Sequence, residues 1–160
     1  MPPLEPAQSP GFLLWHAALR WQRHIVAALA PLDLTHVQFV LLASTWWLNE
    51  HGREPTQVAL AGHAGTDIKM TSQVIRALER KGLVRRTVDP VDTRARRLAV
   101  TAAGAALAPR AITAVESADA AFFSGVEPRR LLSVLSALAD FGSGPASGSR
   151  LAPGGPAEPG

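Results

Sequence analysis

The stretch MTSQVIRALERKGLV, residues 70–84, carries the clearest structural pattern in this chain of 160 residues. Its apolar side chains recur every three or four positions, as expected for the buried face of a helix: Met70, Val74, Ile75 and Leu78. Asp67 is suited to cap this helix, which is expected to end near Lys81. Gly82 follows at the position where glycine commonly ends a helix. We therefore predict a helix from Asp67 to about Lys81 and a change of structure after Gly82.

A shorter helix is expected directly before this one. Thr56 is suited to cap it, and one buried stripe is predicted: Val58, Leu60 and Ala61. Gly62 is its expected end, and Gly65 with Thr66 forms a tight turn into the next helix. Two helices joined by a tight turn that contains glycine predict a helix-turn-helix motif.

The residues after Gly82 change to a strand pattern. The segment LVRRTV (83–88) has a β-like pattern, and RRLAVT (96–101) partly alternates polar and apolar residues. Between them lies a turn-forming sequence, Asp-Pro-Val-Asp, at residues 89–92. We predict a basic β-hairpin, or wing, attached to the helix-turn-helix.

Further helices are expected on both sides of this unit, over residues 11–29, 35–48, 102–124 and 128–141. Thr35 and Gln38 have the spacing of a capping box. In the last helix one face is expected to point inward: Leu131, Leu132, Leu135 and Leu138. The predicted fold class is mainly α with a small β-hairpin wing, a winged helix-turn-helix flanked by N- and C-terminal helices.

Composition sets the expected domain boundaries. Residues 1–10 contain four prolines and no helical or strand period, which predicts a flexible arm. Residues 142–160 contain six glycines and four prolines, with too little apolar surface to offset the entropy of ordering, which predicts a disordered tail. Residues 11–141 then form one domain.

The net charge of +3 is unevenly distributed. Between Gly65 and Thr101 there are nine Lys or Arg and four Asp or Glu, whereas the rest of the chain has seven basic and nine acidic residues. A basic segment in an otherwise mildly acidic chain favours a polyanionic partner, although a solvated charged surface has the same composition.

Several function classes are disfavoured. Without cysteine there is no thiolate nucleophile and no cysteine-ligated metal, and the five histidines lack the spacing of a helical metal site. We find no Gly-rich phosphate loop, Gly-x-Ser-x-Gly elbow or clustered acid pair, so we predict neither an enzyme nor a cofactor. No apolar run approaches 18 residues and the N-terminus lacks a basic signal-peptide start, which predicts a cytoplasmic protein.

Three stretches resemble the MarR family of bacterial transcription regulators: residues 34–42 (LTHVQFVLL), 70–84 and 89–101 (DPVDTRARRLAVT). The resemblance extends over about residues 11–141. It implies a homodimer in which helices 11–30 and 102–141 form the interface and residues 34–101 form a DNA-binding lobe. It also implies a regulator, usually a repressor, that binds a pseudo-palindromic operator and often releases it when a small, frequently aromatic, molecule binds. The absence of cysteine removes the thiol-based peroxide sensors of the family.

The resemblance and residue chemistry together suggest DNA contacts. On the recognition helix the candidates are Lys69, Thr71, Ser72, Gln73 and Arg76. These side chains can pair with base edges or phosphates. On the hairpin strands the candidates are Arg85, Arg86, Arg96 and Arg97, some for phosphates and others structural. The resemblance places Arg94, at the wing tip, in the minor groove, where a narrow A·T groove attracts arginine.

The resemblance also implies an effector pocket between the dimerisation helices and the DNA-binding lobe. The candidate lining residues are Trp15, His16, Leu19 and Trp46. Aromatic walls with a few polar groups suit a flat, hydrophobic ligand. The alternative is that a tryptophan only fills space in the hydrophobic core, and we favour this alternative for Trp21 and for one of Trp46 and Trp47.

Two other functions fit the same pattern. A winged-helix module can bind a protein partner, with its basic face incidental. A MarR-like protein can also activate transcription, because the sign of regulation depends on where the operator lies relative to a promoter.

Overall fold

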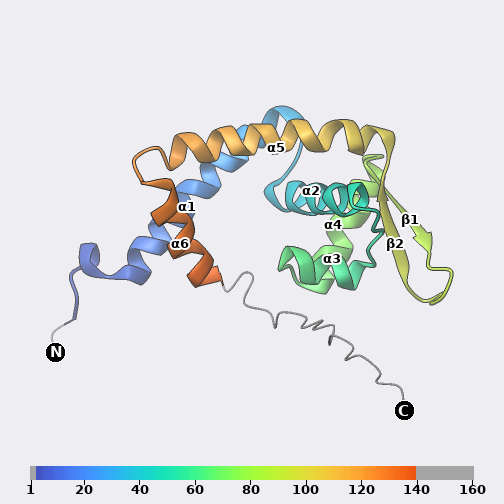
Figure 1. Ribbon diagram of the computed structural model, residues 1–160, viewed down its shortest axis with the longest axis horizontal. Coiled ribbons are helices and arrows are strands. Elements are labelled where there is room, and N and C mark those ends of the chain that lie inside the picture. Colours follow the sequence, from blue (N-terminus) through green and yellow to red (C-terminus); the bar gives the residue numbers. More distant parts are fainter. Residues whose placement is uncertain (1–2, 140–160) are drawn as a thin grey trace, which may run out of the picture. The chain divides into compact units, whose positions relative to one another are not determined.

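The computed structural model describes residues 3–139. Two 3-10 turns, six α-helices and a two-stranded antiparallel hairpin follow one another in these residues: η1 (Pro6–Gln8), α1 (Pro10–Leu29), η2 (Ala30–Leu32), α2 (His36–Glu50), α3 (Gln57–Ala64), α4 (Ile68–Arg80), β1 (Val84–Val88), β2 (Arg96–Val100), α5 (Ala102–Phe122) and α6 (Pro128–Ala139). Figure 1 shows the hairpin projecting from the helices as a wing. The predicted fold class, a mainly helical winged helix-turn-helix, is confirmed.

The predicted helix caps are present. Thr35 and Gln38 form a reciprocal capping box at the start of α2, with both hydrogen bonds at 3.2 Å. The Thr56 hydroxyl accepts from the Ala59 amide, and the Asp67 carboxylate accepts from the Met70 amide. These side chains satisfy amides that the first turn of a helix leaves without partners, which is why α2, α3 and α4 begin where they do.

Two expectations about the helix-turn-helix were wrong in detail. Helix α3 continues past Gly62 to Ala64, and Gly65 ends it in the left-handed conformation with φ of 67°. Val58 was expected in the buried stripe but is 63% exposed. An isolated helical glycine costs only about 1 kcal/mol, so Gly62 does not stop the helix.

The buried face of α4 is rotated from the predicted one. Thr71, Ile75 and Leu78 are fully buried, whereas Met70 is 44% exposed and Val74 is half-buried. Burial of a threonine is possible here because its hydroxyl donates to the Asp67 carbonyl at 2.8 Å and also meets the Thr66 hydroxyl at 2.7 Å. The buried positions of α4 are therefore Thr71, Ile75 and Leu78, which are spaced i, i+4 and i+7, and the series does not begin at Met70.

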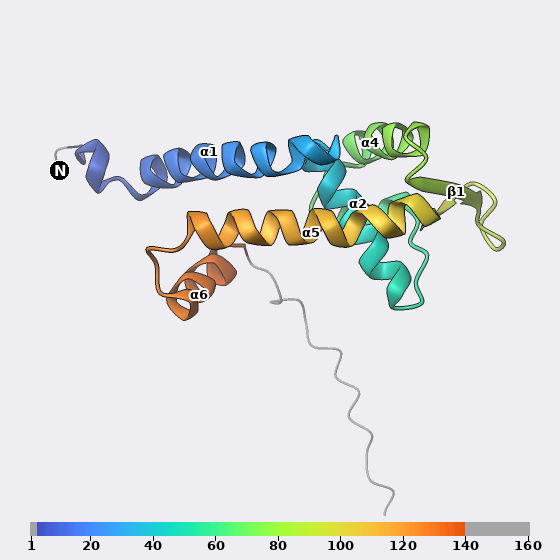
Figure 2. The same ribbon diagram turned by 90° about the horizontal axis from the view of Figure 1, so that it is seen from above.

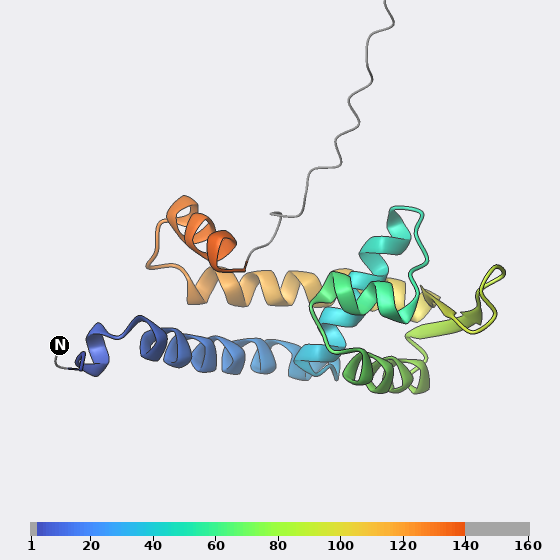
Figure 3. The same ribbon diagram turned by 90° about the horizontal axis from the view of Figure 1, so that it is seen from below.

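Helix α5 connects the N-terminal helices to the wing. It lies alongside α1 for much of its length (Figures 2 and 3) and also packs against α2 and β2. The core that these elements share is aliphatic and includes Ile25, Leu41, Leu98 and Ala108. Near its start, Gly104 packs directly on the backbone of Leu83, so the helix meets the base of the wing at close range.

The hairpin pairs Val84 with Val100 at its base and Val88 with Arg96 at its outer end. A single bridge between Thr56 and Arg97 joins the start of α3 to β2. The wing is thus attached both to the helix-turn-helix and, through Thr101, to α5.

Large apolar side chains are exposed on α1: Phe12, Leu13, Leu14, Trp15 and Val26. Helix α6 belongs to a second compact unit, which begins at Ser124. None of the leucines expected to face inward is buried within this unit: Leu131 is half-buried, and Leu132, Leu135 and Leu138 are exposed. Four large apolar side chains of α6 are exposed: Leu132, Val134, Leu135 and Leu138.

The other expected boundaries remain predictions. Within the predicted arm, residues 6–8 form the turn η1. The predicted tail at 142–160, and the last two residues of the predicted final helix, lie outside the described residues.

Among the described helices none is long and apolar enough by itself to cross a membrane. The one pair that passes this test jointly, Pro10–Leu32 with His36–Glu50, is bent by 71°.

Candidate nucleic-acid interface

The N-terminal half of α4 presents a polar surface. Lys69, Gln73 and Arg76 are exposed and Ser72 is half-buried. Because Thr71, Ile75 and Leu78 hold the opposite side of the helix against the core, these four side chains remain on the outside. The structure thus leaves four of the five predicted recognition-helix residues available to a partner.

Thr71 is the exception, and its predicted DNA contact needs correction. Its side chain is fully buried, and its hydroxyl is engaged by Thr66 and Asp67. A buried, hydrogen-bonded hydroxyl supports the turn between α3 and α4 and does not reach a base edge. Thr71 is therefore a positioning residue of the motif.

The arginines of the wing separate into those with an acidic partner and those without one. Arg85, Arg94 and Arg96 are exposed and have no acidic partner within residues 3–139. Arg86 is half-buried and forms an ion pair with Glu79, with nitrogen–oxygen distances of 2.8 and 2.9 Å. This pair connects β1 to α4 and so fixes the wing relative to the recognition helix.

Arg97 and Asp89 form a second pair, at the start of the wing loop. The Arg97 Nε donates to Asp89 Oδ2 at 2.6 Å, and its Nη1 donates to the Glu54 carbonyl at 3.2 Å. Asp89 Oδ1 accepts from the amides of Asp92 and Val91. These backbone hydrogen bonds, together with Arg97, lower the pKa of Asp89 despite its burial. Asp89 therefore stays ionised and organises the wing turn, as its turn-forming role in the sequence suggested.

Two positioning residues were not expected from the sequence. Lys81, just after α4, contacts the Asp33 carbonyl, the Asp33 carboxylate at 3.2 Å and Gln38 Oε1 at 3.1 Å. Asn49, at the end of α2, donates to the carbonyls of Arg53 and Leu98 and accepts from the Val100 amide at 2.8 Å. Gln38 lies 43 residues from Lys81 in the chain, and Val100 lies 51 residues from Asn49. No local sequence signal reports such contacts.

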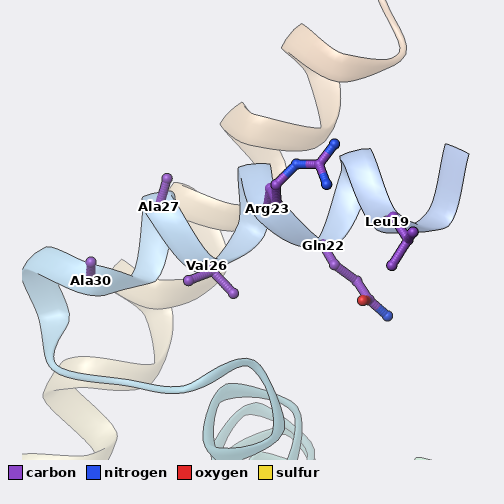
Figure 4. A pocket seen from close by; sticks show the side chains of 6 residues that line it. All are labelled: Leu19, Gln22, Arg23, Val26, Ala27 and Ala30. Carbon is purple, nitrogen blue, oxygen red and sulfur yellow. The ribbon is translucent and has the colours of Figure 1, made fainter. Parts of the chain in front are cut away.

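The predicted effector residues are not brought together. Trp15 is 62% exposed, the His16 ring lies 4.4 Å from that of Phe12, and Trp46 packs partly buried against the core. A cavity of about 400 Å³ beside Leu19 is lined by residues of α1 and by Ala30, the first residue of η2 (Figure 4). These four residues therefore do not line one pocket in the single chain.

A polar cluster does occupy the junction of α1, α2 and α5. The Trp21 indole nitrogen donates to Asp119 Oδ1 at 2.7 Å, and the Trp21 and His36 rings meet edge to face at 5.1 Å. Burial lowers the pKa of His36, and the nearby Asp119 carboxylate partly opposes this shift. Trp21 thus joins three helices through both packing and a hydrogen bond.

The lowered pKa of His36 predicts loss of stability on mild acidification. The unfolded chain binds a proton at this histidine more readily than the folded chain, so stability is highest above the ordinary pKa of 6.5 and falls as pH drops below it. We expect Tm to decrease between pH 7.5 and 5.5, and to decrease less in His36→Gln. Differential scanning calorimetry of both proteins measures this difference, and equal pH dependence would contradict it. Asp89 stays ionised across this range because its pKa is lowered from 3.8.

An exposed polar recognition helix beside an arginine-bearing hairpin defines a winged helix-turn-helix DNA-binding protein. The family model for the MarR family matches residues 34–95. The uncharacterized HTH-type transcriptional regulator YdcH of Bacillus subtilis is 47% identical over 119 residues, which cover 74% of this chain and 81% of that protein. This chain belongs to the MarR family. It is a transcription regulator and not an enzyme.

Two further similarities are to a transcriptional repressor and to a protein of known structure with a bound ligand. An HTH-type transcriptional repressor of Mycobacterium tuberculosis is 34% identical over 110 residues, covering 69% of this chain and 76% of that protein. The crystal structure of CouR from Rhodococcus jostii RHA1, bound to p-coumaroyl-CoA, superposes with a TM-score of 0.73 at 26% identity and covers 86% of this chain and 96% of that one. The predicted family and winged-helix fold are thereby confirmed.

Proposed function

We propose that this protein is a cytoplasmic, homodimeric repressor that binds a pseudo-palindromic operator and releases it on binding a small, aromatic effector. The observation that carries the DNA-binding part is the exposed face of α4 next to exposed arginines of the wing that have no acidic partner among the described residues. The repressor function of the M. tuberculosis relative and the aromatic acyl group in the CouR complex support the regulatory part.

The side chains on α4 are suited to reading sequence. Arg76 can pair with guanine, Gln73 with adenine, and Ser72 with base edges or phosphates. Lys69, near the start of the helix, is placed for a phosphate. Because Thr71 is buried, the residues that we propose to read bases are Ser72, Gln73 and Arg76.

Arg94 is the proposed minor-groove residue. The Asp92 carboxylate accepts from the Arg94 amide at 3.1 Å and so shapes the backbone at the wing tip, while the Arg94 side chain is exposed. An arginine on a narrow, shaped loop can enter a narrow A·T minor groove, whose potential attracts it.

Homodimerisation gives a reason for the open apolar surfaces. Phe12, Leu14 and Trp15 on α1 are about half exposed or more, and α6 by itself has an unpartnered leucine face. Monomeric proteins rarely leave contiguous apolar patches of this kind open. A second copy that covers them places two winged modules on one duplex, with half-sites separated by about one helical turn, ~34 Å.

Sensitivity to salt tests the proposed DNA interface. Lys69, Arg85 and Arg96 at phosphates and Arg94 in the minor groove give each subunit roughly four DNA-bound cations, so a dimer releases about eight counterions. We expect DNA captured from a random duplex pool to be a pseudo-palindrome, and its association constant to fall with a log–log salt slope of about −7. Fluorescence anisotropy at several salt concentrations measures the slope. A slope near zero would remove the DNA-binding proposal and favour a winged-helix module that binds a protein.

A further inference from the structure

Helix α4 carries an exposed apolar side chain in its first turn. Met70 is 44% exposed and does not belong to the hydrophobic core of the described residues. The next residue, Thr71, occupies the buried stripe in its place. Because successive residues of a helix point about 100° apart, Met70 lies between that stripe and the outer face. Its thioether therefore flanks the surface that α4 offers to DNA.

The neighbours of Met70 on the helix surface are polar or basic. Gln73 follows three residues later, and side chains three residues apart are adjacent on a helix. Lys69 and Arg76 are exposed on the same part of α4. Phosphates and base edges give these polar side chains partners, and the thymine methyl is the apolar group that the major groove offers to Met70.

We propose that Met70 reads a thymine methyl group in each half-site, next to the base that Gln73 contacts. The inference rests on the proposed function, because it adds a specificity-determining residue to the proposed DNA surface. Residues near the N-terminal end of a recognition helix contact base edges, and Met70 is the third residue of α4. Its unbranched thioether has three rotatable bonds, so it can adapt its shape to a methyl group.

Such a contact gives a preference for thymine that hydrogen bonds do not supply. Removing the methyl group from thymine leaves its base pairing unchanged but takes away the apolar partner of Met70. Burial of one methyl group corresponds to about a fourfold change in affinity. A dimer makes the contact in both half-sites, so removing both methyl groups should weaken binding roughly 15-fold.

Deoxyuridine substitution tests the contact, because deoxyuridine differs from thymidine only in lacking this methyl group. In the operator captured from a random duplex pool, each symmetric pair of thymines is replaced in turn, and fluorescence anisotropy with the full chain measures the affinity. We expect one pair at which the replacement weakens binding roughly 15-fold. In Met70→Ala this ratio should fall to about one at that pair alone, whereas Met70→Leu should keep most of it.

Ile68→Ala is the matched control. Ile68 is also an exposed apolar side chain in the first turn of α4, but residues two apart do not face each other on a helix. This variant should keep the ratio at the Met70 position. A purely structural role for Met70 would weaken binding of the thymine and deoxyuridine duplexes equally and leave their ratio unchanged. Circular dichroism verifies that each variant is folded.

The methionine content of the chain offers a direct spectroscopic probe of the same contact. Met70 is one of two methionines, and the other is Met1. With ¹³C-labelled methionine methyl groups, the Met70 signal is identified by its loss in Met70→Leu. In the operator complex this signal should show a nuclear Overhauser effect to a thymine methyl group, and the effect should disappear with the deoxyuridine duplex.

Three results would overturn the proposal: a selected half-site without thymine, no thymine pair whose replacement weakens binding, or a ratio that Met70→Ala leaves unchanged. The last result would assign the effect of the methyl group to the shape of the duplex. Each of the three is compatible with a sequence-specific regulator, so the proposed function would stand. If no sequence is enriched from the pool, the proposed function fails and this inference fails with it.

Discussion

Replacing Gly104 with alanine is expected to lower the free energy of unfolding by about 3 kcal/mol. A Cβ at this position would lie 2.0 Å from the Leu83 carbonyl oxygen and 3.3 Å from the Val100 Cβ. The clash is with backbone, which cannot rotate away as a flexible side chain would. The Leu83 carbonyl is also fixed by the Thr101 amide at 3.0 Å, and the Thr101 hydroxyl donates to the Gly82 carbonyl. The start of α5 would therefore have to move away from the wing.

The loss should be visible as a large fall in Tm. For a domain of this size each 1 kcal/mol corresponds to roughly 3–5 °C, so we expect a decrease of about 10 °C by calorimetry. Alanine is the better helix former by about 1 kcal/mol, but that gain is smaller than the cost of the clash. The matched control is Gly62→Ala in α3, where a Cβ would have no atom within 4 Å. That variant should be neutral or slightly more stable, and equal stability of both variants would contradict the close packing.

The order of elements was accessible from the sequence because it depends on local patterns. Caps at Thr35, Thr56 and Asp67 act within one turn, and apolar spacing of three or four residues identifies a helix wherever its buried face is. Periodicity was less informative about which face is buried. In α4 it favoured Met70, since it cannot recognise that Thr71 is satisfied by Thr66 and Asp67 and so tolerates burial.

The residue types of the candidate site could be predicted from the sequence, but the ion pairs that its arginines form could not. The sequence shows that the wing is rich in arginine, yet Arg86 is engaged by Glu79 seven residues away and Arg97 by Asp89 eight residues away. Which arginine is paired depends on the register of the hairpin and on how it packs against α4. The effector residues on α1 and α2 were chosen from a family resemblance, and a single chain does not bring them together.

Reversing the charge of Arg76 and Arg94 together is expected to abolish specific DNA binding, with a loss of at least 100-fold. An arginine paired with guanine contributes about 1–3 kcal/mol of discrimination, and a glutamate there is also repelled by the phosphates. Arg76 is exposed on the recognition helix and Arg94 at the wing tip, so neither substitution disturbs the core. Anisotropy with the selected operator measures the loss.

The two single variants should affect DNA binding in different ways. Arg76→Glu should relax preference at one base position of each half-site, whereas Arg94→Glu should weaken binding most at A·T-rich flanks.

Arg80→Glu is the matched control: it makes the same charge change on the same helix, but at its C-terminal end, outside the proposed contacts. It should cost only a few-fold, and that cost should disappear at higher salt as screening increases. If Arg80→Glu were as damaging as Arg76→Glu, binding would depend on overall charge and not on the N-terminal half of α4. If the double variant kept operator affinity, α4 and the wing would not be the DNA-binding surface.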